Sequence, residues 1–231
     1  MILSAHQPNF IPWTGYFLKV ALSDIHVILD KVEYSKNGWT NRNKIKLASD
    51  SYITLPVRKK DTGRLICDVN VGENYKPIIN KTRKTLRQFY GKSPGFEFID
   101  SIFFDAIDMD TTSLFSINYY IITRLLDHLG IDTPLVLMSN TTTGKELKSS
   151  DLLINLCLEN KCNQYFSGLG SKDYLDESKF AKSSIDVVWL NDMDTVLNKF
   201  NMTNNSVIEP IFNHGDKSKD IIGQMIDEVS L

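Results

Sequence analysis

The sequence has few cysteines, almost no net charge and no long apolar run, and each shortage excludes a class of protein. No window approaches the roughly 18 apolar residues of a membrane span, so we expect none. The net charge of -2 offers no basis for general nucleic-acid binding, so no nucleic-acid partner is expected. The first residues lack the basic and apolar regions of a signal peptide, and the expected location is therefore the cytoplasm.

The cysteines are too few and too poorly spaced for a disulfide framework or a zinc site. The chain has three, Cys67, Cys157 and Cys162. The last two form a C-x4-C pair with no matching Cys or His pair elsewhere. We predict free, partly buried thiols and no metal site.

The composition, with 42% hydrophobic and 23% charged residues in a chain of 231, is typical of one globular domain. Short apolar runs alternate with amphipathic segments, which predicts an α/β fold: a Rossmann-like, mostly parallel sheet with helices on both faces. The expected strands begin at residue 2 and cover 25–29, 134–138, 164–167 and 185–190. The expected helices follow Pro12 and cover 74–90, 96–104, 112–129, 151–161 and 218–229.

Two segments depart from this alternation. Residues 34–72 read as a β-rich insertion over the mouth of a crevice, with a hairpin of 44–47 and 52–57 and a third strand at 67–71. Residues 191–231 read as an irregular tail that ends in a helix. We expect residues 1–231 to form a single domain that includes both.

Two polar residues end neighbouring strands. His6 stands at the end of the first strand, which Pro8 closes, and Asp30 ends the second. Ligands of open parallel sheets collect at this edge, so His6 is the expected general base, with an ordinary pKa of about 6.5. Asp30 would orient the imidazole or hold a substrate amine. A structural histidine and a capping aspartate are the alternatives.

Further polar and aromatic residues are candidates for substrate binding. Arg42, between two asparagines, combines a guanidinium fork with amide donors, and Trp39 offers a stacking face. A Ser-Gly-x-Gly-Ser turn after a strand offers backbone N–H groups and positive-φ positions to an anion. A solvated loop and a simple chain reversal are the alternatives, and Tyr16 also suits the core. The predicted binding residues are Gln7, Asn9, Trp13, Tyr16, Lys36, Trp39, Asn41, Arg42, Asn43, Ser167, Gly168, Gly170 and Tyr174.

Several of these residues belong to motifs that resemble one family. The chain has His6-Gln7-Pro8, Pro12-Trp13-Thr14-Gly15-Tyr16-Phe17, Asp30, Asn41-Arg42-Asn43, and Tyr165-Phe166-Ser167-Gly168 running to Gly170 and Tyr174-Leu175. In this order they resemble the WbqC family of bacterial proteins. The resemblance implies O-antigen or polysaccharide gene clusters and modification of a sugar precursor.

A weaker likeness is to the HIGH-type nucleotidyltransferases, whose two histidines clamp nucleotide phosphates. Tyr16 stands at the second histidine position here. This disfavours adenylyl transfer and leaves binding of a nucleotide-sugar diphosphate open.

Together these features lead to a functional hypothesis. We expect a transferase that passes an acyl or aminoacyl group to the amine of a nucleotide-linked amino sugar. The donor would be a thioester of CoA or of a carrier protein, with no bound cofactor. A hydrolase or lyase in the same crevice, and a non-catalytic binding subunit of a polysaccharide assembly complex, are the alternatives.

Overall fold

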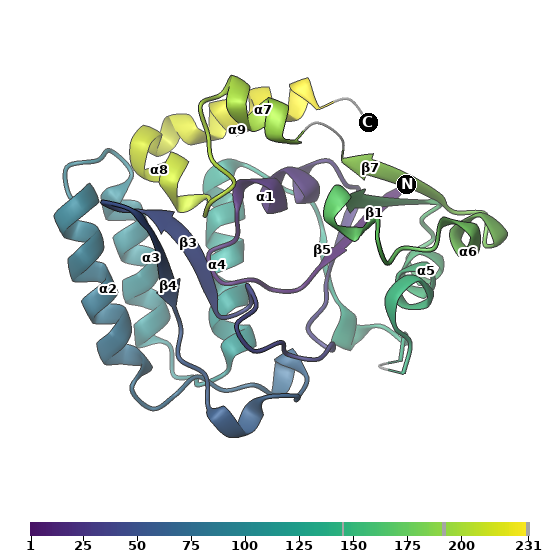
Figure 1. Ribbon diagram of the computed structural model, residues 1–231, viewed down its shortest axis with the longest axis horizontal. Helices are drawn as coiled ribbons and strands as arrows, with labels where there is room; N and C mark the ends of the chain where they lie inside the picture. The colour runs from purple at the N-terminus through teal and green to yellow at the C-terminus, as the bar shows by residue number, and fades with distance from the viewer. Residues whose placement is uncertain (145, 191–192, 230–231) are drawn as a thin grey trace.

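A parallel sheet of five strands forms the centre of the computed structural model, which describes residues 1–144, 146–190 and 193–229 (Figure 1). The strands lie in the order β5-β2-β1-β6-β7, and every neighbouring pair is parallel. This order, with β1 at the point where the topology reverses, confirms the predicted Rossmann-like α/β fold. The strands are β1 (Ile2–His6), β2 (Ile25–Ile28), β5 (Leu135–Leu137), β6 (Gln164–Gly168) and β7 (Asp186–Leu190).

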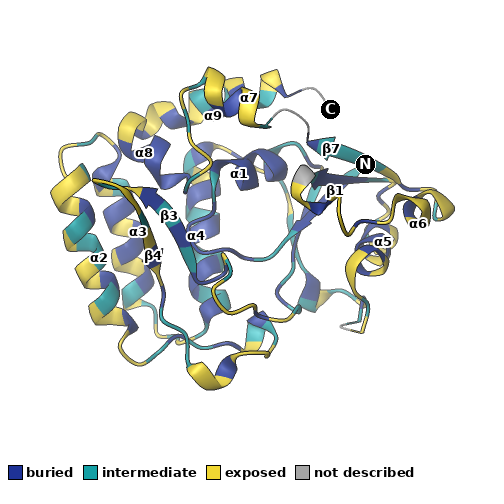
Figure 2. Ribbon diagram, in the orientation of Figure 1, coloured by how far each residue is buried: buried dark blue, intermediate teal, exposed yellow. Residues whose placement is uncertain are grey.

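Helices cover both faces of the sheet. Successive side chains of each strand point to opposite faces, and apolar side chains on both faces need to be covered. Leu3, Ala5 and Val27 pack against α5 and α6. Phe166 and Leu190 belong to a larger core that includes α1, α4 and α9. In Figure 2 the ribbon is dark blue, or buried, along most of β1 and on the inner faces of the helices, and teal along much of β7. The bounds of these helices are α1 (Thr14–Ala21), α4 (Leu114–Leu129), α5 (Ser149–Glu159), α6 (Glu177–Lys182) and α9 (Ser218–Glu228).

The chain between β2 and β5 forms a hairpin and a layer of three helices, seen side by side in Figure 1. The predicted hairpin is confirmed, but the predicted third strand at 67–71 is wrong. A 3₁₀ turn forms instead, closed by hydrogen bonds from Asp68 N–H to Leu65 O at 2.9 Å and from Val69 N–H to Ile66 O at 3.2 Å. The elements are β3 (Arg42–Lys46), β4 (Asp50–Thr54), η1 (Lys59–Asp61), η2 (Ile66–Asp68), α2 (Tyr75–Tyr90), α3 (Phe96–Asp108) and then α4.

The C-terminal segment is helical where an irregular tail was predicted. It contains α7 (Met193–Lys199), α8 (Ile208–His214) and η5 (Gly215–Lys217) before the predicted terminal helix, α9. Pro210 is compatible with this helix because it lies in the first turn of α8, where its missing N–H costs no helical hydrogen bond.

The start of α8 is tied to the loop that follows β1. Ser206 donates its hydroxyl to Ile11 O at 2.7 Å, and Val207 N–H donates to Pro12 O at 2.9 Å. The backbone of Trp13 also bridges to Ser206. The C-terminal segment therefore holds the loop that leads from His6 into α1.

The three cysteines are free, as predicted, and two of them, Cys157 and Cys162, are buried. Burial raises the pKa of Cys157 to about 12, so this thiol is unreactive at neutral pH. Within the described residues, no helix combines the length and apolarity that crossing a membrane would need.

Candidate functional site

His6 ends β1 at the reversal point of the strand order. Its Nδ1 lies 3.1 Å from the carbonyl oxygen of Gln7. Because a carbonyl only accepts hydrogen bonds, Nδ1 carries the proton and Nε2 keeps its lone pair. The ring is part-buried, and Nε2 has no hydrogen-bond partner among the described residues. His6 therefore presents an acceptor nitrogen at the carboxyl end of the central strand.

Aromatic side chains fix the plane of this imidazole. The rings of Trp13 and Tyr16 meet it edge-on, with centroids 5.0 and 5.4 Å away. Both come from the entrance and first turn of α1, so the sequence PWTGYF places them beside His6. Of the predicted site residues, His6, Gln7, Trp13 and Tyr16 are thus brought together.

The imidazole is neutral over the whole physiological range. Burial, and after it the positive charge of Lys19, lower the pKa of His6 to about 3 against the opposing effect of the Gln7 carbonyl. The sequence-based expectation of an ordinary pKa near neutrality is therefore wrong. His6 remains in its proton-accepting form, but it is a weak base.

Asp30 does not hold the imidazole. Its carboxylate is buried and accepts a 2.9 Å hydrogen bond from Ser139 N–H, in the 3₁₀ turn η3 (Met138–Asn140) that follows β5. No hydrogen bond joins Asp30 to His6 in the part of the chain that the structure describes. The predicted orienting role is wrong because the Gln7 carbonyl already occupies Nδ1, and the carboxylate instead links the ends of β2 and β5.

Lys19 is the charged group nearest to this site, and the sequence analysis missed it. Its ammonium group is buried and donates to Ala5 O at 3.0 Å, and burial lowers its pKa to about 8. The signal was present: Lys19 lies three residues after Tyr16 and so falls on the same face of the helix. A polar residue on the inward face of α1 indicated an interior cation.

A second histidine lies beneath the first. His26 Nδ1 is 2.7 Å from the Ser4 hydroxyl, and its ring meets Tyr16 at 5.4 Å. Burial, with the neighbouring Lys19 and His6, holds the pKa of His26 well below its ordinary value. The hydroxyl of Tyr16 and the Nε2 of His26 are buried without a partner among the described residues. The sequence-based interpretation of His26 as structural fits this position inside the sheet.

Polar side chains from distant elements fix the loop after His6. Thr40 donates its hydroxyl to Gln7 Oε1 at 3.2 Å, and Phe10 N–H donates to Trp39 O at 3.1 Å. Asn118, on α4, donates to Pro8 O at 2.8 Å and to Thr40 O at 2.7 Å. Asn118 was not predicted as a site residue. Its contact with Pro8 spans 110 positions of the chain, and no local sequence pattern indicates such a contact.

The two asparagines around Arg42 serve the fold rather than a ligand. Asn43 donates its amide to Ile11 O at 2.8 Å, and Asn41 donates to Leu55 O at 2.8 Å while it accepts from Tyr34. Both are buried. Their predicted role as ligand donors is wrong, because the backbone uses their amide groups.

Other predicted binding residues of the same segment remain accessible. Trp39 is 45% exposed, and the Arg42 guanidinium lies 4.6 Å from the centre of the Tyr52 ring. Lys36 is exposed on the preceding turn. Asn9, in contrast, is buried, and its Nδ2 has no partner among the described residues. Trp39 therefore has a free stacking face, and Asn9 has a free donor.

The turn after β6 supplies the other side of the reversal point. The hydroxyls of Ser167 and Ser171 are hydrogen-bonded, and Ser171 also donates to Gly168 O at 2.8 Å. A 3₁₀ turn (Leu169–Ser171) follows the strand. Gly168 and Gly170 do not have positive φ, so that part of the prediction is wrong. A Cβ at either glycine would meet no heavy atom within 4 Å, so both border open space.

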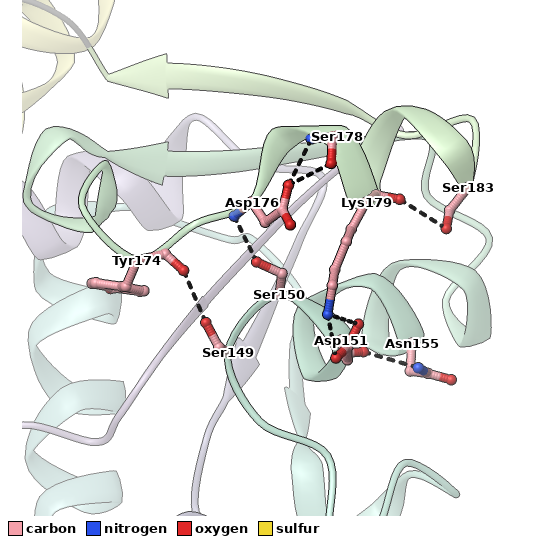
Figure 3. Close-up of polar contacts among 9 residues, drawn as sticks. All are labelled: Ser149, Ser150, Asp151, Asn155, Tyr174, Asp176, Ser178, Lys179 and Ser183. Atoms are coloured by element: carbon pink, nitrogen blue, oxygen red, sulfur yellow. Dashed lines mark hydrogen bonds and ion pairs between the residues drawn. The ribbon is translucent and has the colours of Figure 1, made fainter.

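The first residues of α5 bond to the segment that follows this turn (Figure 3). Ser149 donates its hydroxyl to Tyr174 O at 3.0 Å, and Asp176 N–H donates to the Ser150 hydroxyl at 2.8 Å. The ring of Tyr174 is 62% exposed. The turn is therefore anchored through its backbone, and the predicted binding residue Tyr174 keeps its side chain free.

A concave surface also lies elsewhere, lined by Arg58, Lys59, Lys60, Glu73 and Asn74. In the described ranges, no three His, Cys, Asp or Glu side chains converge as metal ligands would. The candidate site therefore lies at the ends of β1 and β6, around His6.

Comparison with known proteins places the chain among relatives. A model of the WbqC-like protein family matches residues 7–221. A relative from Mycobacterium tuberculosis (strain ATCC 25618 / H37Rv), "Uncharacterized protein Rv1507c", is 31% identical over 193 residues, which cover 79% of each chain. No solved structure matches. Since the family model spans nearly the whole chain, this protein belongs to the WbqC-like protein family.

Proposed function

We propose that this protein is a cytoplasmic transferase that passes an acyl or aminoacyl group from a thioester to the amine of a nucleotide-linked amino sugar, in O-antigen or related polysaccharide synthesis. The observation that carries the proposal is the tautomer of His6. Its Nδ1–H is bound to the Gln7 carbonyl, which leaves the Nε2 lone pair facing the end of the sheet where ligands of this fold bind.

The weak basicity of His6 favours an amine as the acceptor group. A base whose pKa is about 3 has little driving force to take a proton from a sugar hydroxyl. Attack of a neutral amine on a thioester, in contrast, first gives a tetrahedral adduct with a cationic nitrogen. The proton on that nitrogen is far more acidic than the proton of a sugar hydroxyl, so its transfer to a weak base such as His6 is much less unfavourable.

The proposed reaction balances without an external oxidant or reductant. The amine nitrogen forms a bond to the thioester carbonyl carbon, and the carbon–sulfur bond breaks as the tetrahedral adduct collapses. His6 Nε2 takes the surplus proton of the nitrogen and passes it to the departing thiolate. The amide and a free thiol are the products, and CoA or a carrier protein fits the donor role.

The surrounding residues suit recognition of a nucleotide sugar. The exposed ring of Trp39 offers a stacking face to a base or sugar, and Lys36 and Arg42 add positive charge on the same segment. The Gly168–Gly170 turn borders open space on the other side of His6. These groups support binding of a ligand that combines a ring with an anionic linker.

The test is a coupling assay with matched histidine variants. The protein is mixed with nucleotide-linked amino sugars and acyl or aminoacyl thioesters, and mass spectrometry detects a joined product. His6→Gln should lower turnover roughly 10²-fold or more, as for other positioned bases. His214→Gln, an exposed histidine at the end of α8, is the control and should be fully active. A split product without joining, or full activity of His6→Gln, would contradict the proposal.

A further inference from the structure

Strands β1 and β6 part before either of them ends. Their register stops at the pair Ser4 and Phe166, although β1 continues to His6 and β6 to Gly168. On their outer sides the two strands stay paired, His6 with Ile28 and Gly168 with Leu190. The last two residues of each strand therefore face each other across a split, at the reversal point of the sheet.

The ammonium of Lys19 takes the hydrogen bond that the ladder would otherwise make. In a parallel ladder the next bond would run from Gly168 N–H to Ala5 O. Lys19 Nζ donates to Ala5 O instead, at 3.0 Å, and lies 5.8 Å from the centre of the Tyr165 ring on β6. With that carbonyl occupied, the amide of Gly168 is left facing the split.

Lys19 has no anionic partner in the described parts of the chain. None of the ion pairs there includes it, although the side chain is only 8% exposed. The neighbouring titratable groups are His6, His26, Tyr16 and Tyr165, and none of them is an anion at neutral pH. A buried cation without a counter-charge is costly unless something supplies that charge.

The space beside the glycines of the turn after β6 is open. A Cβ on Gly168 would meet no heavy atom within 4 Å, and the same holds for Gly170. The ammonium of Lys19, the backbone N–H of Gly168 and the imidazole of His6 all lie where β1 and β6 part, at the edge where parallel sheets bind phosphates.

We propose that Lys19 and the backbone N–H of Gly168 form a diphosphate-binding site in the split between β1 and β6. The diphosphate supplies the missing counter-charge to Lys19. This inference rests on the proposed function, because it assigns the anionic linker of the nucleotide-sugar substrate to particular groups. It also places that linker beside His6.

The experiment measures binding by calorimetry, with UDP, inorganic pyrophosphate and uridine as probes and without an acyl donor. Lys19→Met should lower the affinity for both diphosphates roughly 10- to 100-fold, the usual effect of one charged hydrogen bond. Gly168→Ala should also lower it, because its methyl enters the space for the anion and meets nothing else. Lys182→Met, an exposed lysine on α6, is the control and should bind like the wild type.

The outcomes separate the inference from the transferase. Loss of diphosphate affinity in Lys19→Met and Gly168→Ala supports the site. If the wild type binds UDP more tightly than pyrophosphate, the source of the diphosphate is a nucleotide. Wild-type affinity in both variants, or no binding of either diphosphate to the wild type, overturns it. If Lys19→Met does not fold, Gly168→Ala decides alone. Binding through Lys19 without any transfer would refute only the transferase.

Discussion

Lys19 donates its ammonium to the carbonyl oxygen of Ala5 across 3.0 Å, one residue before His6. Burial is the main reason for the low pKa of His6, and the charge of Lys19 is the next. Lys19→Met should therefore raise the pKa of His6 from about 3, while burial keeps it below the ordinary value of about 6.5. Carbon-detected NMR of the imidazole over a pH titration measures this shift.

The control for this prediction is Lys182→Met, which changes the net charge equally but lies on the exposed surface of α6. His26 and Tyr16 also face His6, and their protonation does not change near neutral pH. An equal shift of the His6 pKa in both variants would show that the shift comes from the change in net charge rather than from the contact with Lys19.

The Rossmann-like sheet could be predicted because its signals are local. Each of three buried strands corresponds to one short apolar segment of the sequence, at Ile2, Val27 and Phe166. Amphipathic helices separate these segments. Gly130 marks the end of α4 because it adopts φ +66° there. Local patterns of this kind act within one element, so the sequence contains them in full.

Only part of the candidate site could be predicted. The ends of the strands indicate which edge of the sheet carries the site, but not which side chains contact each other there. His6 and Asp30 end neighbouring strands, yet Asp30 bonds Ser139 and His6 bonds Gln7. The partner of Asp30 lies 109 positions along the chain, in the turn after β5, so no local pattern identifies it. Lys19 was also missed, since a buried lysine is rare even on the inward face of a helix.

Asn118 fixes the loop after His6 and should matter for both stability and turnover. Its amide donates to Pro8 O and Thr40 O, so Asn118→Ala leaves two buried carbonyls without this donor. We expect a loss of roughly 2 kcal/mol or more in the free energy of unfolding. Urea denaturation measures it. The transfer assay should show a lower kcat, since the loop that carries Gln7 loosens.

The matched control is Asn155→Ala, which removes a local bond to Asp151 O on the exposed side of α5 (Figure 3). It should change the free energy of unfolding by less than about 0.5 kcal/mol, as surface substitutions do. Equal losses in the two variants would mean that Asn118 contributes no more than an exposed asparagine.

Asp100 should make the stability of the helical layer depend on pH. Arg83 holds it with two 2.8 Å hydrogen bonds and Arg87 adds a third at 3.0 Å, and these contacts lower the pKa of Asp100 against the opposing effect of burial. A carboxylate with a lowered folded pKa stabilises above its unfolded pKa, and this contribution is lost as the pH falls through the folded value.

Asp100→Asn should therefore lower the free energy of unfolding at pH 7 by about 1.5–3 kcal/mol, and the difference from wild type should shrink in acid. Denaturation at a series of pH values measures both effects. Asp227→Asn, an exposed position on α9, is the control. A difference that is constant from pH 7 to acid would contradict the ionic origin of the effect.

Trp39 should contribute to ligand affinity without contributing to the fold, because almost half of its side chain is exposed and its ring is 6.4 Å from that of Tyr52. Stacking of a base on an aromatic ring is worth about 1–3 kcal/mol, so Trp39→Ala should weaken UDP binding roughly 5- to 100-fold. The affinity for inorganic pyrophosphate, which has no ring, should stay unchanged. Phe89→Ala, with an equally exposed ring on α2, is the control. If UDP and pyrophosphate weaken together in Trp39→Ala, the ring shapes the loop rather than stacks on the base.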